Sequence, residues 1–163
     1  MKFCKVLNVK TPTRGTPGSA GLDFYIPEDT KEFKHEFVNK NEEASYTERG
    51  ITIRPHSRVN IPSGIKVNIP KDHVLIAFNK SGVSLRYGLD VGACVVDEDY
   101  QGEIHISLVN TTRDTQYLRF GEKVIQFLLL PIIYPELEEV SEDDCFDEET
   151  ERGSGAFGST GIN

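Results

Sequence analysis

The chain has no tryptophan, one methionine and three cysteines among its 163 residues. The cysteines Cys4, Cys94 and Cys145 are odd in number and lack the C-x-x-C spacing, so the sequence predicts neither a disulfide framework nor a zinc site. No apolar run approaches the ~18 residues of a membrane-spanning helix. The first residues also lack the apolar stretch of a secretory signal. We therefore expect a reduced, intracellular protein without a membrane partner.

Basic residues are in the minority, with 18 Lys and Arg against 26 Asp and Glu, a net charge of −8. The sequence therefore lacks the basic footprint of a nucleic-acid-binding protein, and we expect no nucleic-acid partner. Ten of the carboxylates lie between Pro135 and Glu151, in a stretch without Lys or Arg, which leaves the remainder at about +2. Like charges at this density favour an extended, solvated connector.

The length suits one domain. The composition predicts three parts: a compact body over residues 1–134, the acidic connector over residues 135–151, and a glycine-rich C-terminal arm over residues 152–163. Within the body, apolar residues alternate with polar ones over 65–69 and 104–108, and Val74, Ile76 and Phe78 repeat the two-residue spacing, which predicts half-buried strands. Residues 124–130 are apolar except for Gln126, which predicts a strand buried on both faces.

Gly- and Pro-containing turns separate these strands, and this spacing predicts an all-β sandwich or barrel. We expect one short helix near Ser81–Arg86, and a loop or hairpin insertion over Lys34–Gly50.

The C-terminal arm nearly matches two nucleotide-binding glycine patterns, but it follows no strand and leaves no room for the helix that both patterns need. Taken alone, it is typical of a disordered tail. Against that interpretation, Arg152 could chelate an anion, Phe157 could cover a flat ring, and the glycines let backbone N–H groups approach an anion closely.

Two further segments are ambiguous when each is taken alone. Lys80, Ser81 and Gly82 follow a predicted strand and could bind a phosphate, or Ser81 could simply cap the helix. Asp97 ends an apolar run and could be a turn residue or a general base toward water.

Together with Asp23 and Gln126, these segments resemble, in order, the five motifs of the homotrimeric deoxyuridine triphosphatase (dUTPase) family. The resemblance spans residues 20–161 and is carried by Ala20-Gly21-Leu22-Asp23-Phe24, Lys80-Ser81-Gly82-Val83-Ser84, the run from Val91 to Gly102, Gly121-Glu122-Lys123-Val124-Ile125-Gln126-Phe127, and Arg152 to Gly161. It implies a jelly-roll-like β-barrel or sandwich with one short helix and a mobile C-terminal arm. It also implies a homotrimer with shared active sites that cleaves dUTP to dUMP and pyrophosphate with Mg²⁺.

The resemblance also assigns roles. Asp97 would be the base that activates the attacking water, and Tyr100 would pack beneath the deoxyribose. Asp23 would reach Mg²⁺ through water, with the metal held mainly by the triphosphate. The remaining substrate contacts would come from Lys80, Ser81, Gly82, Ala93, Cys94, Val95, Gln126, Arg152, Phe157, Gly158, Ser159 and Thr160.

Three positions depart from the family pattern. Lys80 stands where the family usually has Arg, Glu122-Lys123 stand for Asp-Arg, and Cys94 replaces a glycine in the hairpin that contacts the pyrimidine edge. The alternatives are a dCTP deaminase or bifunctional relative of the same fold, and a non-catalytic nucleotide-binding relative. For the main hypothesis we expect action in the cytoplasm, in the nucleus, or as a viral protein within a host cell. There it would limit uracil incorporation into DNA and supply dUMP for dTMP synthesis.

Overall fold

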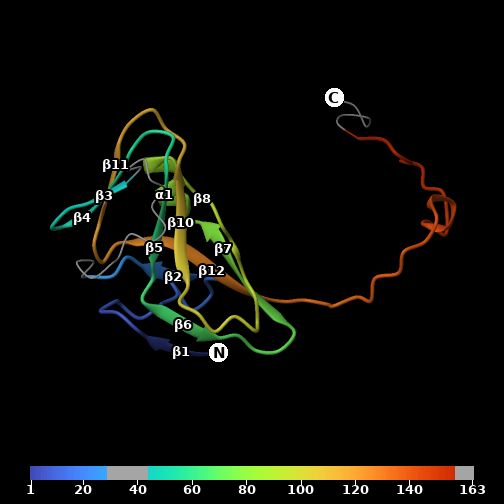
Figure 1. Ribbon diagram of the computed structural model, residues 1–163, viewed down its shortest axis with the longest axis horizontal. Helices are drawn as coiled ribbons and strands as arrows, with labels where there is room; N and C mark the ends of the chain where they lie inside the picture. The colour runs from blue at the N-terminus through green and yellow to red at the C-terminus, as the bar shows by residue number, and fades with distance from the viewer. Residues whose placement is uncertain (29–43, 157–163) are drawn as a thin grey trace. The chain divides into compact units, whose positions relative to one another are not determined.

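The computed structural model describes residues 1–28 and 44–156, which consist mostly of short strands with one α-helix (Figure 1). The elements in chain order are β1 (Lys2–Lys5), β2 (Leu22–Tyr25), β3 (Ala44–Tyr46), β4 (Gly50–Ile53), β5 (Arg58–Pro62), β6 (Ile65–Asn68), β7 (His73–Asn79), α1 (Ser81–Tyr87), β8 (Leu89–Val91), β9 (Val95–Val96), β10 (His105–Asn110), β11 (Gln116–Arg119), β12 (Lys123–Pro131) and the 3-10 turn η1 (Glu142–Asp144).

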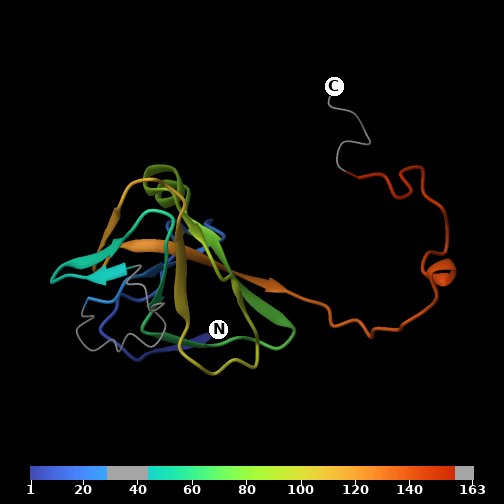
Figure 2. The same cartoon turned by 45° about the horizontal axis from the view of Figure 1, so that its top comes forward.

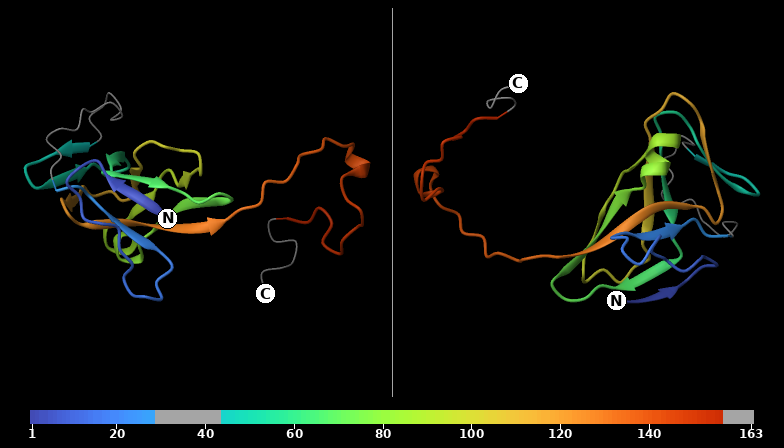
Figure 3. Two further views of the ribbon diagram at one scale, coloured as in Figure 1. Left: turned by 90° about the horizontal axis from the view of Figure 1, so that it is seen from below. Right: turned by 180° about the vertical axis from the view of Figure 1, so that it is seen from behind.

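All strand pairs in these residues are antiparallel, and they form sheets of order β1-β6, β5-β10-β8, β11-β4-β3 and β2-β12-β7-β9. Figure 3 shows the β1–β6 pair, dark blue beside green, as a ribbon of its own. The described strands make separate packed sheets and no closed barrel. The all-β prediction is confirmed, and the sandwich form describes these sheets better than the barrel form.

Where apolar and polar residues alternate along a strand, buried and more exposed side chains alternate in the structure. Along β10 the side chains alternate between half-buried and buried, with Ile106 and Leu108 almost completely buried. The side chains of β6 alternate in the same way until the strand ends at Asn68. One face of each strand packs on the other sheets, so an apolar residue at every second position indicates which side chains are buried. The largest fully buried side chains are Phe24, Phe127, Ile26, Ile51, Ile53, Ile61, Ile65, Leu75, Leu89, Ile104, Ile106 and Leu108.

Strand β12 departs from the prediction that it is buried on both faces. Val124, Ile125 and Phe127 are buried, but residues 128–130 are only half-buried. The first half of β12 pairs with both β2 and β7, whereas from Leu128 onward it pairs with β7 alone. The second half therefore has an open edge on the β2 side.

The chain divides into two units, Met1–Ile133 and Tyr134–Asn163. The first contains every described strand. In its described part the second contains only the turn η1, and apolar side chains such as Leu137 and Phe146 are exposed there (94% and 79%). The predicted limits of the acidic connector and of the arm remain predictions.

Several smaller expectations concern turns and insertions. Helix α1 lies where it was predicted and ends at Gly88, whose φ of 57° is the left-handed conformation that glycine adopts easily. Of the Lys34–Gly50 segment, residues 34–43 lie outside the described residues, and residues 44–53 form the β3–β4 hairpin.

The three cysteines are free and exposed. Among the described residues, no helix is long and apolar enough to cross a membrane.

A core substitution tests whether β12 anchors the body. The Phe127 ring lies 4.5 Å from the Phe24 ring, centroid to centroid, and both side chains are 1% exposed. We expect Phe127→Ala to lower the free energy of unfolding by about 3–5 kcal/mol, because it removes a buried ring and leaves a cavity. Guanidinium unfolding at fixed protein concentration measures this, with Leu85→Ala at an 86% exposed position as the control. Equal losses in the two variants would contradict this account of the core.

Candidate functional site

The register of β12 brings three distant segments together. Gln126 lies opposite Asp23 of β2 on one side and Phe78 of β7 on the other, and Ile125 lies opposite Asn79. Figure 2 shows β12, in orange, running between these two strands. The first and fourth predicted segments therefore meet at the same level of one sheet, next to the end of β7 from which the second segment continues.

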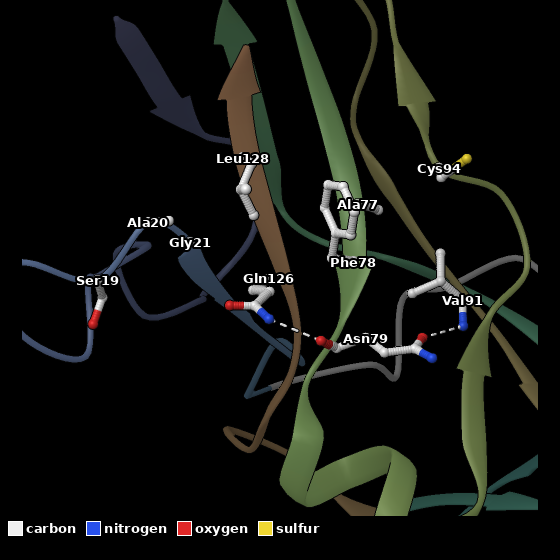
Figure 4. A pocket seen from close by; sticks show the side chains of 10 residues that line it. All are labelled: Ser19, Ala20, Gly21, Ala77, Phe78, Asn79, Val91, Cys94, Gln126 and Leu128. Atoms are coloured by element: carbon white, nitrogen blue, oxygen red, sulfur yellow. Dashed lines mark hydrogen bonds between the residues drawn. The ribbon is translucent and has the colours of Figure 1, made fainter.

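A pocket of about 720 Å³ opens at this place (Figure 4). It draws on four of the five predicted segments or on their immediate neighbours. Its lining consists of Ser19, Ala20, Gly21, Ala77, Phe78, Asn79, Val91, Cys94, Gln126 and Leu128. Nη1 of Arg14 holds one wall in place, since it donates to the carbonyls of Ser19 and Ala20 at 2.5 and 2.6 Å.

Gln126 is fixed from two directions. Its Nε2 donates to the main-chain oxygen of Asn79 at 2.8 Å, which supplies the partner that a half-buried amide needs. On the other side, a Cβ atom at Gly21 would overlap the Gln126 amide. The absence of a side chain at position 21 therefore leaves room for the Gln126 amide in this position.

The Lys80-Ser81-Gly82 segment leads from β7 into α1. The residue preceding the helix is Lys80, with no side-chain cap bond, and Ser81 is the first helical residue. The interpretation of Ser81 as a simple helix cap is therefore wrong. Ser81 and Gly82 are exposed, and a Cβ atom at Gly82 would meet nothing within 4 Å. The fold thus leaves open space at Gly82.

Asp23 is the electrostatic centre of this region. Its carboxylate is almost buried, with 5% of the side chain exposed, and it binds Nζ of Lys80 at 2.5 Å and Nζ of Lys123 at 3.1 Å. The hydrogen bond to Asp23, and then the charge of that carboxylate, raise the pKa of Lys123 above its ordinary value of 10.5. Lys80, Lys123 and Gly82 also line a groove of about 470 Å³.

The site offers Mg²⁺ few carboxylate ligands. Within residues 1–28 and 44–156, no group of three or more His, Cys, Asp or Glu side chains could hold a metal ion. Asp23 supplies one carboxylate, and both of its oxygens already bind ammonium groups. A hydrated Mg²⁺ that arrives on a triphosphate suits this arrangement, because it needs few protein ligands.

The third segment is held against β7. The Ala77 N–H donates to the Cys94 carbonyl at 2.8 Å, and Val95 and Val96 pair with Ile76 and Leu75. Ala93, Cys94 and Val95 are exposed, and Cys94 lines the pocket.

Asp97 and Tyr100 come next in the third segment, after Val96. Asp97 is exposed, and its main-chain oxygen accepts from the Tyr100 N–H at 3.2 Å. The Tyr100 hydroxyl donates to the Glu103 carbonyl at 2.9 Å, and a Cβ atom at Gly102 would overlap the Tyr100 ring. Tyr100 lines a second groove, of about 440 Å³, which includes Phe3 and Gln101. One chain therefore does not place Tyr100 in the pocket that contains Gln126.

The fifth segment belongs to the second unit of the chain. Arg152 is exposed, and its Nε donates to the Gly155 carbonyl at 2.9 Å. The predicted ligands Phe157, Gly158, Ser159 and Thr160 lie outside the described residues.

Several lining residues, among them Phe78 and Asn79, were not predicted as site residues from the sequence. A signal was present, because both stand at the end of a predicted strand directly before Lys80. It was weak, since neither residue type indicates a particular chemistry.

Known proteins resemble this chain in sequence and in fold. The family described as dUTPase matches residues 45–161. A curated relative, the deoxyuridine 5'-triphosphate nucleotidohydrolase of cowpox virus, is 36% identical over 163 residues, which cover 99% of this chain and 93% of the relative. Among solved structures, the fold is similar to a Staphylococcus bacteriophage 80alpha dUTPase mutant with dUpNHpp, with a TM-score of 0.77, 21% identity and coverage of 99% and 98% of the two chains.

A second solved structure resembles a smaller part of the chain. It is a point mutant of the dUTPase from phage phi11 of S. aureus, with a TM-score of 0.66, 19% identity and coverage of 86% of this chain and 96% of that chain. Its description mentions the coordination of a structural Mg(II) ion.

The raised pKa of Lys123 predicts how stability depends on pH. A lysine whose pKa is higher in the folded state stabilises the protein at every pH below its unfolded pKa of about 10.4, and this contribution is lost as pH rises through the folded pKa. We therefore expect Lys123→Met to be less stable than the unmodified protein at about pH 9, and the difference to shrink toward about pH 11.5. Denaturant unfolding along that range measures it.

The matched control is Lys71→Met, which removes an exposed lysine outside the Asp23 cluster. It should show a small difference from the unmodified protein throughout. A difference for Lys123→Met that stays constant from about pH 9 to about pH 11.5 would contradict the ion pair as its source.

Proposed function

The chain belongs to the dUTPase family, and we propose that it hydrolyses dUTP to dUMP and pyrophosphate by water attack on the α-phosphorus. The observation that carries the proposal is one pocket lined by residues of the first, third and fourth segments and by Asn79, directly before the second. Asp23, which lies opposite Gln126, binds Lys80 and Lys123. By enzyme class such a protein is a dUTP diphosphatase, and its curated relatives are named deoxyuridine 5'-triphosphate nucleotidohydrolases.

The phosphate side of the site comes from Lys80, Ser81, Gly82 and Gln126. Ser81 offers a hydroxyl and Lys80 a cation beside the groove. Glycine at position 82 is not required by packing, because a side chain there would meet open space. Its absence of a Cβ instead lets a phosphate oxygen approach the main-chain N–H groups closely.

Contacts to base and sugar come from the third segment. Ala93, Cys94 and Val95 are exposed residues that would contact the pyrimidine edge, and Tyr100 would pack beneath the deoxyribose. The Tyr100 ring is held by the hydroxyl bond to Glu103 and by the lack of a side chain at Gly102, so its position is fixed before substrate binds.

Asp97 acts as the general base. The residue is exposed to solvent, which lets a water molecule reach the carboxylate. It takes one proton from water while the water oxygen bonds to the α-phosphorus. The bond from the α-phosphorus to the oxygen bridging to the β-phosphate breaks, and pyrophosphate leaves. A positioned base of this kind contributes about 10²–10⁴-fold.

Mg²⁺ enters as part of the substrate. When bound to the triphosphate, the ion neutralises charge on the phosphate oxygens. Asp23 would hold it through water, beside the two lysines that it already binds.

We also propose a homotrimer with shared sites. Tyr100 and Gln126 line different cavities of one chain, so a complete site needs a second copy. Apolar side chains left exposed at the end of the first unit and beyond it, such as Ile133 (90%) and Leu137 (94%), suit burial against other copies. Arg152, Phe157, Gly158, Ser159 and Thr160 of the arm would then close over a neighbouring pocket and grip the terminal phosphate and the base.

The biological role that follows is to limit uracil in DNA and to supply dUMP, with action inside cells or infected cells. The alternatives differ in their products. A dCTP deaminase would release ammonia from dCTP, and a non-catalytic relative would bind dUTP without releasing pyrophosphate. Pyrophosphate release from dUTP without ammonia from dCTP separates the three.

Substitution of the proposed base tests the mechanism. We expect Asp97→Asn to lower kcat for dUTP by about 10²–10⁴-fold, because the amide cannot take the proton, while binding of dUTP is kept. Pyrophosphate release and equilibrium binding measure the two effects. Asp99→Asn, which removes a carboxylate two residues away, is the matched control and should turn over normally. Equal turnover in both variants would remove Asp97 from the mechanism.

Deletion of residues 152–163 tests the arm. The described strands of the first unit do not include these residues, so the truncated protein should fold and keep its oligomeric state. Its turnover of dUTP should fall by about 10²-fold or more, because the groups that position the terminal phosphate are lost. Circular dichroism, light scattering and pyrophosphate release check the three points. Normal hydrolysis by the truncated protein would refute the closing role of the arm.

A further inference from the structure

Asn79, the last residue of β7, binds three other parts of the chain. Its main-chain oxygen accepts from Nε2 of Gln126 on β12. Its side-chain Oδ1 accepts from the Val91 N–H at 2.7 Å, and its Nδ2 donates to Oδ1 of Asp90 at 2.7 Å. Figure 4 shows the bonds to Gln126 and Val91 on opposite sides of Asn79.

The side-chain amide replaces a missing strand pairing. Strand β7 belongs to the β2-β12-β7-β9 sheet and β8 belongs to the β5-β10-β8 sheet, so no backbone ladder joins these two described strands. The Asn79 amide gives Val91 an acceptor and Asp90 a donor, as a peptide group of a neighbouring strand would. Its orientation is unambiguous, because an N–H must face oxygen and a carboxylate must face N–H.

The Asp90 carboxylate is itself held in place. Its Oδ1 also accepts from the Ser84 hydroxyl at 2.9 Å, and Ser84 belongs to α1. The Asn79 amide therefore meets an acceptor that is already oriented, so the pair costs less conformational entropy to form.

The turn that follows Val91 carries the proposed base-contacting residues. Its first residue, Gly92, donates its N–H to the Ser107 carbonyl at 3.0 Å, and the Cys94 carbonyl accepts from the Ala77 N–H at 2.8 Å. Asn79 supplies the anchor on the β8 side, directly before the turn, and it is a side chain rather than a backbone group.

We propose that Asn79 is a positioning residue that sets base selectivity, because it fixes the backbone of residues 91–94 against β7. The inference rests on the proposed function, in which Ala93, Cys94 and Val95 contact the pyrimidine. Uracil and cytosine present opposite hydrogen-bonding groups at the same edge, so backbone groups discriminate between them only if their N–H and C=O stay in place.

A reciprocal exchange tests the proposal. Asn79→Asp keeps the shape but sets a carboxylate against that of Asp90, which breaks the Nδ2 bond. The double variant N79D/D90N restores a donor–acceptor pair, with the amide now on residue 90, and has the net charge of the unmodified protein. Asp90→Asn alone completes the cycle.

The measurement is the ratio of kcat/KM for dUTP to kcat/KM for dCTP, taken well below the unfolding temperature of every variant. We expect Asn79→Asp to lower this ratio by about tenfold or more, and the double variant to recover most of it. The bond to Val91 is lost in Asn79→Ala, which serves in place of Asn79→Asp if the latter does not fold and should lower the ratio similarly.

A purely structural role would lower both kcat/KM values by the same factor and leave the ratio unchanged, and that result would overturn the proposal. So would a double variant whose ratio is no higher than that of Asn79→Asp. Failure of the proposed function is distinct, because the unmodified protein would then show no preference for dUTP.

Discussion

The position of β12 between β2 and β7 is the constraint on which the site depends. Because Gln126 lies opposite both Asp23 and Phe78, residues about a hundred positions apart in sequence share one level of the sheet. A shift of one residue would turn Gln126 to the other face and move the buried Phe127 toward solvent. The same apolar packing that stabilises the body therefore also determines which polar groups meet at the pocket.

The side chains around Asp23 carry a charge of opposite sign to the net charge of the whole chain. The net charge is −8, yet the carboxylates are concentrated in residues 135–151, and two lysines bind Asp23 beside the pocket. A triphosphate bound here responds mainly to the cations nearest to it, because salt screens charges beyond about 8–10 Å. The nearly buried Asp23 holds Lys80 and Lys123 in place, so their ammonium groups are positioned before substrate arrives.

Much of the fold could be predicted from the sequence, because alternation reports burial directly. The strands around 65–69 and 104–108 and the helix after Lys80 are where the pattern placed them. Pairing could not be predicted in this way, since the contact of Lys123 with Asp23 depends on tertiary register. The half-exposed end of β12 arises because β2 is shorter than its partner. The five segments were ambiguous one by one and were joined by a family resemblance, whereas the role of Asn79 was missed because its side-chain partners lie on another sheet.

The central claim is that separate segments of the chain surround one nucleotide, and amide hydrogen exchange in the presence of Mg²⁺ and an imido analogue of dUTP tests it most directly. The account predicts slower exchange around residues 20–22, 80–83 and 92–96, near Gln126 and in the arm, with the rest of the body unchanged. Slower exchange confined to a single one of these segments, or in none, would contradict the account.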